Sequence, residues 1–270
     1  MPTDPASNLP TDPDPGPGGL PGGTAPERSG DGPEHPVAPG APGAGDVAPG
    51  APLHRGRSPF AAVLFDMDGT LVDSTPSVER CWARWAEEMD IDLRRLLGWH
   101  GVPAAAIARA LLPPERVEAG VARITELELE DTDGIRPLPG AAEALAVLPV
   151  GRAAIATSCT RPLARARLAA AGLDAPEVVV TADDVSRGKP DPEPFLLAAQ
   201  RLGVDASRCL VVEDAPAGLA AARAAGCATL GVTTTTPAGE LSADVVVRDL
   251  AQVRVVVDED GVHVLAGGPA

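Results

Sequence analysis

The second half of the chain alternates short apolar stretches with segments of helical periodicity, and this alternation constrains the fold most strongly. The expected strands are residues 153–156, 177–180, 209–212, 228–232 and 245–247, and the expected helices between them are residues 162–171, 194–202 and 218–225. Alternation of this kind predicts an α/β fold, a Rossmann-like parallel sheet with helices on both faces. Beyond it, residues 253–257 and 262–265 flank an acidic turn and predict a hairpin.

The first strand lies far from the others along the chain. Residues 61–65 form an apolar run that ends at Asp66, typical of a buried parallel strand with a functional residue at its carboxyl end. Helical spacing follows in residues 77–89, 104–112, 115–129 and 141–148. We therefore expect a catalytic core of residues 59–74 and 146–270, and an inserted helical cap of residues 75–145. A cap in this place would cover the carboxyl ends of the strands, where open α/β sheets bind ligands.

Residues 1–58 are rich in Pro, Gly and Ala and show no apolar periodicity. Such a segment cannot bury enough apolar surface to offset its ordering entropy, so we expect it to be disordered. Three interpretations stay open: a dispensable tail, a start site assigned too far upstream, and a partner-binding segment. A truncated chain that starts near Ser58 should keep its activity if the tail is only a passenger.

The charge balance excludes several classes of partner. The net charge is -16 and the isoelectric point is about 4.6, whereas nucleic acids and anionic membranes require basic surfaces. The sequence shows neither a membrane-spanning apolar stretch nor a secretory signal. We expect a cytoplasmic protein, a monomer or weak dimer, whose scattered cysteines stay reduced. These cysteines are Cys81, Cys159, Cys209 and Cys227.

Lys189 is the only lysine in the chain. Because every other strong base is arginine, this position is expected to need a compact point charge rather than a planar fork. A lone lysine is more often a solvated surface residue. Here Gly188 and Pro190 fix a tight loop around it, and its charge could neutralise the negative charge on a transferring group.

Two carboxylates follow the first expected strand. Asp66 ends the strand, and Asp68 lies in a turn that Gly69 permits. A carboxylate beside a metal ion can attack phosphorus, and a second carboxyl group can protonate the leaving oxygen and then deprotonate water. This spacing, after an apolar strand, favours Asp66 as a nucleophile and Asp68 as an acid/base over a plain turn.

Polar residues also follow two later strands. Thr157 and Ser158 could hold a phosphoryl oxygen, although such a pair before a helix is more often just an N-cap. Glu213 and Asp214 could also be helix caps. Because Mg²⁺ takes few protein carboxylates, Asp66 and Asp214, with the backbone carbonyl of Asp68, would suit it.

In this order, the segments 65–70, 156–161, 180–185, 187–192 and 212–218 resemble the haloacid dehalogenase superfamily, over about residues 60–247. The helical insert is similar to the cap of its sugar-phosphatase and β-phosphoglucomutase-like branch. The resemblance implies that Asp66 is the nucleophile, Asp68 the acid/base and Lys189 the clamp, with Thr157 binding phosphate. It implies a Mg²⁺ site made by Asp66, Asp68 and Asp214, with Glu213 as a possible water-mediated ligand. The expected substrate-binding residues are Thr70, Ser158, His100 and Gly101; the last two lie in a segment that resembles the family's substrate-facing loop.

The function implied is a Mg²⁺-dependent phosphatase that hydrolyses small sugar or polyol phosphates through an aspartyl-phosphate. The alternative is a hexose-phosphate mutase. Mutases that resemble β-phosphoglucomutase carry a cap His where this chain has Val78 and a cap Arg where it has Pro103 and Ala104. Water is therefore the preferred final acceptor. A catalytically silent binding module is a third interpretation, but it would normally have lost a motif residue, and none is lost here.

Overall fold

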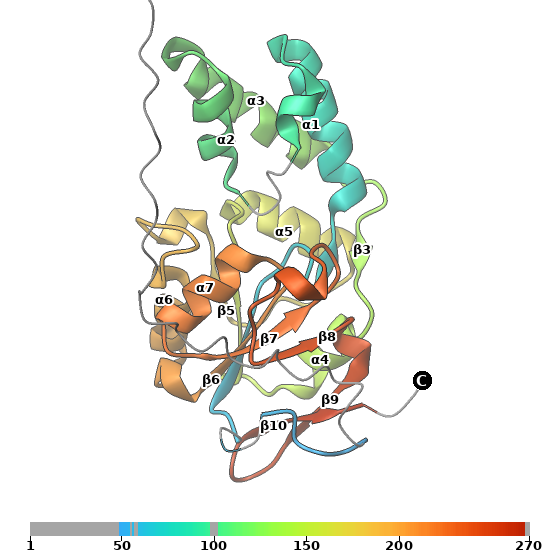
Figure 1. Ribbon diagram of the computed structural model, residues 1–270, viewed down its shortest axis with the longest axis vertical. Helices are drawn as coiled ribbons and strands as arrows, with labels where there is room; N and C mark the ends of the chain where they lie inside the picture. Colours follow the sequence, from blue (N-terminus) through green and yellow to red (C-terminus); the bar gives the residue numbers. More distant parts are fainter. Residues whose placement is uncertain (1–48, 55, 57–58, 98–101, 268–270) are drawn as a thin grey trace, which may run out of the picture. The chain divides into compact units, whose positions relative to one another are not determined.

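The computed structural model describes residues 49–54, 56, 59–97 and 102–267. Its centre is a six-stranded parallel sheet (Figure 1). The strand order is β5-β4-β1-β6-β7-β8. The strands are β1 (Ala62–Phe65), β4 (Ala153–Ala156), β5 (Val178–Val180), β6 (Cys209–Glu213), β7 (Ala228–Val232) and β8 (Val245–Val247). Strand β1 therefore lies between β4 and β6, and the carboxyl ends of these three parallel strands meet at one edge of the sheet.

Helices cover both faces of the sheet, as the alternation of strands and helices predicted. α6 (Glu193–Leu202) and α7 (Pro216–Ala224) pack on one face, and α4 (Ala141–Val147) and α5 (Arg161–Ala170) pack on the other. The side chains of β1 alternate between the two apolar clusters: Leu64 packs on the side of α6 and α7, and Val63 and Phe65 pack on the side of α4 and α5. The sheet is thus buried on both sides, which explains why its strands read as continuous apolar runs.

The insert between β1 and β4 carries a separate helical cap. Its helices are α1 (Thr75–Met89), α2 (Ala104–Leu111) and α3 (Val117–Glu130), which stand together in Figure 1. They have an apolar core of their own, in which Trp85 is fully buried and donates from its indole N–H to the carbonyl of Gly120 at 2.8 Å. Strands β2 (Val72–Asp73) and β3 (Arg136–Pro137) pair antiparallel, so the chain enters and leaves the cap through adjacent segments.

Helix α4 lies within the cap boundaries drawn from the sequence, 75–145, but it packs elsewhere. Ala141 and Ala144 belong to the apolar cluster of the sheet, not to that of the cap helices. The helix also contacts β9 (Val253–Val257). This packing favours a cap that ends before Ala141.

A two-stranded sheet of β9 and β10 (Val262–Ala266) forms the predicted hairpin, and residues 49–54 pair with its free edge. The N–H of Gly50 donates to the carbonyl of Ala266 at 2.9 Å, and that of Leu53 donates to the carbonyl of Val264 at 3.0 Å. Leu53 and His54 are buried. The prediction of disorder up to residue 58 is therefore wrong for residues 49–54, because backbone pairing with a hairpin edge needs no apolar periodicity. Residues 1–48 lie outside the described part of the chain.

The other strands and helices predicted for the core and cap are confirmed, with small shifts at their ends. Along the described residues, none of the helices combines the length and the apolar character that crossing a membrane requires. Short 3-10 helices complete the fold at Leu93–Leu96, Pro114–Arg116, Ala182–Asp184, Ala206–Arg208, Ala238–Glu240 and Leu250–Gln252.

Two truncations should separate the contribution of residues 49–58 from that of the segment before them. A chain that begins at Pro49 keeps the contacts of residues 50–53 with β10, whereas a chain that begins at Pro59 loses these and keeps only the pair of Phe60 with Val262. Loss of the buried Leu53 side chain and of the backbone pairing is expected to cost about 2 kcal/mol, or roughly 4–8 °C in Tm. Thermal unfolding followed by circular dichroism measures the difference, and equal Tm values would show that the pairing does not stabilise the fold.

Candidate active site

Three carboxylates gather where β1 and β6 end. Asp66 follows β1, and Glu213 and Asp214 end and follow β6. The N–H of Asp66 donates to the carbonyl of Val212 at 3.0 Å, which holds the two strand ends in register. One carboxylate oxygen from each of the three residues lies within 4.8 Å of the others, and all three residues are buried.

Lys189 lies between two of these carboxylates. Its Nζ donates to Oδ1 of Asp66 at 2.5 Å and to Oε2 of Glu213 at 2.8 Å. The side chain is only 6% exposed, and Nζ lies 5.0 Å from the ring centroid of Phe195 on α6. An ammonium group satisfies both carboxylates from one point, which explains why a lysine stands in this loop.

Both carboxylate oxygens of Glu213 accept hydrogen bonds. Its Oε1 accepts from the backbone N–H groups of Asp214 and Ala215 at 3.2 and 3.1 Å, while Oε2 accepts from Lys189. A Cβ atom on Gly218 would lie 2.6 Å from the Cγ of Glu213 and still closer to its carboxyl group. Glycine at the start of α7 therefore makes room for this side chain.

Asp214 is held by two threonine hydroxyls. Thr70 donates to Oδ1 at 3.1 Å, and Thr235 donates to Oδ2. Gly69 adopts φ +84°, and a Cβ there would lie 2.7 Å from the Cγ of Asp214, so both its backbone and its lack of a side chain are required. Thr70, predicted to bind substrate, is 1% exposed and contacts the acidic group.

The loop after β7 contributes residues that sequence reasoning missed. Thr234 donates to the backbone carbonyl of Gly69, next to the contact between Thr235 and Asp214. The available signal was a run of four threonines, 233–236, directly after an apolar strand. Because a threonine run at a strand end is common in turns, it did not indicate a role in the site by itself.

The electrostatics of the group are dominated by burial. Burial and repulsion from Glu213 raise the pKa of Asp66 to about 7, and burial raises the pKa of Glu213 to about 7 although Lys189 opposes it. Burial and repulsion from Asp66 raise the pKa of Asp214 to about 6. Burial alone would lower the pKa of Lys189, but attraction to Asp66 and Glu213 outweighs it and raises that pKa.

This donor set fits a hard divalent cation. Within the described residues, a single ammonium faces three buried carboxylates, so the group carries excess negative charge when ionised. Oxygen ligands are those that Mg²⁺ prefers. A bound cation would offset the repulsion that raises the three pKa values.

Asp68 lies two residues beyond Asp66 but has other partners. Its Oδ1 accepts from the hydroxyl of Ser74 at 2.6 Å and pairs with Nη1 of Arg167 at 3.0 Å, and its Oδ2 accepts from the Cys159 thiol at 3.0 Å. The side chain is 26% exposed, more than those of Asp66 and Glu213. Its carboxyl group is thus bound by the residue before α1, by α5 and by the loop after β4 rather than by Lys189.

The hydroxyl residues lie at the end of β4, next to β1. Thr157 is buried, and its Oγ1 accepts from the N–H of Cys159 at 3.1 Å; Ser158 is half-buried. Burial raises the pKa of the Cys159 thiol, which disfavours the thiolate. Two predicted substrate residues, His100 and Gly101, lie outside the described residues.

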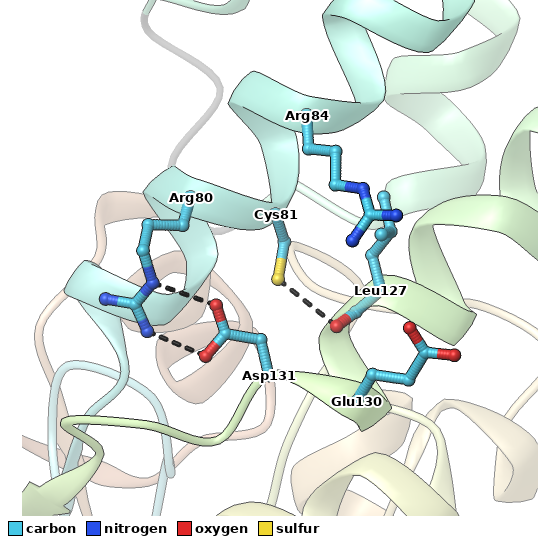
Figure 2. Close-up of a pocket in the computed structure, with 6 residues that line it drawn as sticks. All are labelled: Arg80, Cys81, Arg84, Leu127, Glu130 and Asp131. Atoms are coloured by element: carbon cyan, nitrogen blue, oxygen red, sulfur yellow. Dashed lines mark hydrogen bonds and ion pairs between the residues drawn. The ribbon is translucent and has the colours of Figure 1, made fainter.

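A separate hollow of about 230 Å³ lies between α1 and α3 of the cap (Figure 2). Arg80 on its rim is bound by both carboxylate oxygens of Asp131, at 2.8 and 2.7 Å. The thiol of Cys81 donates to the carbonyl of Leu127 at 3.3 Å. These polar groups thus hydrogen-bond to one another between α1 and the end of α3. No residue of the acidic group lines the hollow, so we attribute it to the packing of the cap helices.

Comparison with known proteins gives a consistent result. The sequence pattern of haloacid dehalogenase-like hydrolases matches residues 60–226. The chain is 42% identical over 205 residues to hexitol phosphatase A of Escherichia coli (strain K12), covering 73% of this chain and 95% of that protein. It is 37% identical over 208 residues to validoxylamine A 7'-phosphate phosphatase of Streptomyces hygroscopicus subsp. limoneus, covering 72% and 96%. A solved hydrolase from Pseudomonas syringae superposes with a TM-score of 0.65 at 32% identity, covering 71% of this chain and 94% of that one.

Asp214→Asn should stabilise the metal-free protein at pH 8. Since the folded state raises the pKa of Asp214 from 3.8 to about 6, its carboxylate costs stability above pH 6 and nothing below pH 3.8. The gain from the substitution should therefore be largest at pH 8, on the order of 1–3 kcal/mol, and vanish near pH 4. Thermal unfolding in EDTA across this range measures it.

The control for this pH experiment is Asp174→Asn, at an exposed carboxylate on the loop after α5, which should leave the pH dependence of the Tm unchanged.

Added Mg²⁺ should raise the Tm of the wild type more than that of Asp214→Asn, because binding to the folded state stabilises it. A lower Tm for Asp214→Asn than for the wild type in EDTA at pH 8 would contradict the electrostatic cost.

Proposed function

The chain belongs to the haloacid dehalogenase-like hydrolases, and we propose that it is a Mg²⁺-dependent phosphatase of small sugar or polyol phosphates. The observation that carries the proposal is Lys189, whose ammonium joins Asp66 to Glu213 beside Asp214. A clamp of this kind, at the meeting point of strand ends, suits a phosphoryl group better than a neutral substrate.

Asp66 is proposed as the nucleophile. Its carboxylate oxygen forms a bond to phosphorus while the bond from phosphorus to the alcohol oxygen breaks, and Asp68 gives its proton to that oxygen. In the second step Asp68 takes a proton from water, the water oxygen bonds to phosphorus, and the bond from Asp66 to phosphorus breaks. Lys189 and the hydroxyl residues Thr157 and Ser158 hold phosphoryl oxygens during both steps.

Asp66 and Asp214, with the backbone carbonyl of Asp68, are the proposed ligands of Mg²⁺. Glu213 is proposed as a ligand through water, because both its oxygens already accept hydrogen bonds from Lys189 and the backbone. When bound, the ion supplies positive charge that offsets the negative charge of the phosphate and of the carboxylates around it.

The substrate class is supported by the relatives, whose names are those of hexitol and validoxylamine phosphatases. Both are covered over almost their whole length. The sequence of the cap does not support the mutase alternative, because Val78 and Pro103–Ala104 stand at the positions of the mutase His and Arg. A cytoplasmic location is part of the proposal, because four cysteines scattered along the sequence without close pairing are typical of a reducing compartment.

Asp66→Asn is expected to abolish phosphate release, at least about 1,000-fold, because an amide cannot attack phosphorus. The assay is liberated phosphate from p-nitrophenyl phosphate and from a panel of hexitol, glycerol, fructose and 2-deoxyglucose phosphates, with Mg²⁺ and with EDTA. Wild-type activity should disappear in EDTA.

The matched control is Asp90→Asn. Asp90 is exposed at the end of α1 with φ +58°, a conformation that asparagine accepts equally well, so this variant should match the wild type. Full activity of Asp66→Asn would overturn the assignment of the nucleophile, and sugar isomerisation without phosphate release would favour the mutase.

A further inference from the structure

Arg167 is a buried arginine that the chemistry described above does not use. It lies on α5 of the core, and its side chain is only 5% exposed. Its two terminal nitrogens contact different carboxylates: Nη1 lies 3.0 Å from Oδ1 of Asp68, and Nη2 donates to Oε1 of Glu128 at 3.2 Å. The guanidinium therefore joins the proposed acid/base to a second acid that is distant in the sequence.

Glu128 belongs to the cap. It lies on α3, which contacts α5, and its side chain is only 10% exposed. Because Glu128 moves with α3, its distance from Arg167 depends on where the cap lies.

Stability alone does not explain this arrangement. Burying an ion pair costs desolvation free energy, and apolar residues of similar volume often serve a fold equally well. The Nε of Arg167 is buried and finds no hydrogen-bond partner among the described residues, so the guanidinium is not fully satisfied. What the arrangement does achieve is orientation, because Ser74, Cys159 and Arg167 together occupy both oxygens of Asp68.

We propose that Arg167 is a positioning residue that ties the orientation of Asp68 to the place of the cap through Glu128. The inference rests on the proposed role of Asp68. With α3 seated on α5, Glu128 holds one nitrogen of Arg167 and the other directs the carboxyl group of Asp68. When α3 moves away, Arg167 loses its cap partner and is free to shift, so one of the three groups that orient Asp68 is no longer fixed.

Comparing an alkyl with an aryl phosphate ester distinguishes a role of Arg167 in orienting Asp68 from a purely structural role. A sugar phosphate loses an alkoxide and needs the proton of Asp68, whereas p-nitrophenyl phosphate loses a stable phenolate and does not. The value of kcat/KM covers only the steps up to departure of the alcohol, so the second use of Asp68, on water, does not enter. A positioning residue for Asp68 must therefore matter for the alkyl ester and not for the aryl ester.

The experiment measures kcat/KM with Mg²⁺ for p-nitrophenyl phosphate and for the sugar phosphate that the panel shows to be hydrolysed fastest. Asp68→Asn sets the scale, with an expected loss of about 100-fold or more on the sugar phosphate and under about 10-fold on the aryl ester. Arg167→Gln should lose about 10–100-fold on the sugar phosphate and less than about 3-fold on the aryl ester. Arg167→Lys, which keeps the charge but not the two separate nitrogens, should recover part of that loss.

Glu128→Gln tests the link to the cap. It should lower kcat/KM for the sugar phosphate by about 3–10-fold in the wild type, and have no further effect in Arg167→Gln, because residues that act through one another are not additive. The matched controls are Arg165→Gln on α5 and Glu130→Gln on α3, both at exposed positions, which should match the wild type. Tm values identify any variant that fails to fold, in which case the milder Glu128→Gln carries the test.

The outcomes are distinct. If Asp68→Asn lowers kcat/KM equally for both esters, the assignment of Asp68 as the acid/base is wrong, and the inference about Arg167 fails with it. If Asp68→Asn lowers kcat/KM only for the sugar phosphate, but Arg167→Gln lowers kcat/KM equally for both esters or for neither, the proposed function stands. Arg167 then has only a structural role. If Arg167→Gln is selective but Glu128→Gln has no effect, the link to the cap is overturned.

Discussion

The ammonium of Lys189, placed between the carboxylates of Asp66 and Glu213, is the interaction on which the rest of the site depends. Three buried acids at adjoining strand ends repel one another, and this ion pair lets two of them be ionised together. The order β4-β1-β6 brings their strands side by side. Gly69 and Gly218 leave room for the side chains of Asp214 and Glu213, because a Cβ atom at either glycine would clash with them. The order of the strands, the charge of Lys189 and the two glycines therefore all contribute to the same acidic group.

Much of this could be predicted from the sequence because each signal was local. The strands are apolar runs that end in polar residues, and the cap helices show a plain helical period, so both were found close to their observed ends. Residues 49–54 were missed because they are held through their backbone to a hairpin edge, which leaves no side-chain pattern. The threonine contacts to Gly69 and Asp214 and the pair of Arg167 with Glu128 depend on how distant segments pack, which no local pattern encodes.

Asp66 and Asp68 show how far environment separates two like residues. Asp66 lies in the acidic group, where burial and neighbouring charge act on it, and its donor is Lys189. Asp68, two residues on, has left the strand and is bound by groups from the start of α1, from α5 and from the loop after β4. The roles proposed for them, nucleophile and proton carrier, need such different surroundings, and the end of a strand followed by a glycine turn supplies both within three residues.

The use of aromatic residues follows the same logic. The chain has three phenylalanines, and all are essentially fully buried: Phe60, Phe65 and Phe195. Phe65 directly precedes Asp66, and Phe195 lies beneath the ammonium of Lys189. In a core built mainly from Ala, Val and Leu, two of these large rigid side chains thus lie next to the proposed nucleophile and its ion-pair partner. An apolar ring beneath Lys189 keeps water from that side of the ammonium, which strengthens its attraction to the two carboxylates while it adds to their cost of desolvation. The ion pair is therefore needed most where the burial is deepest.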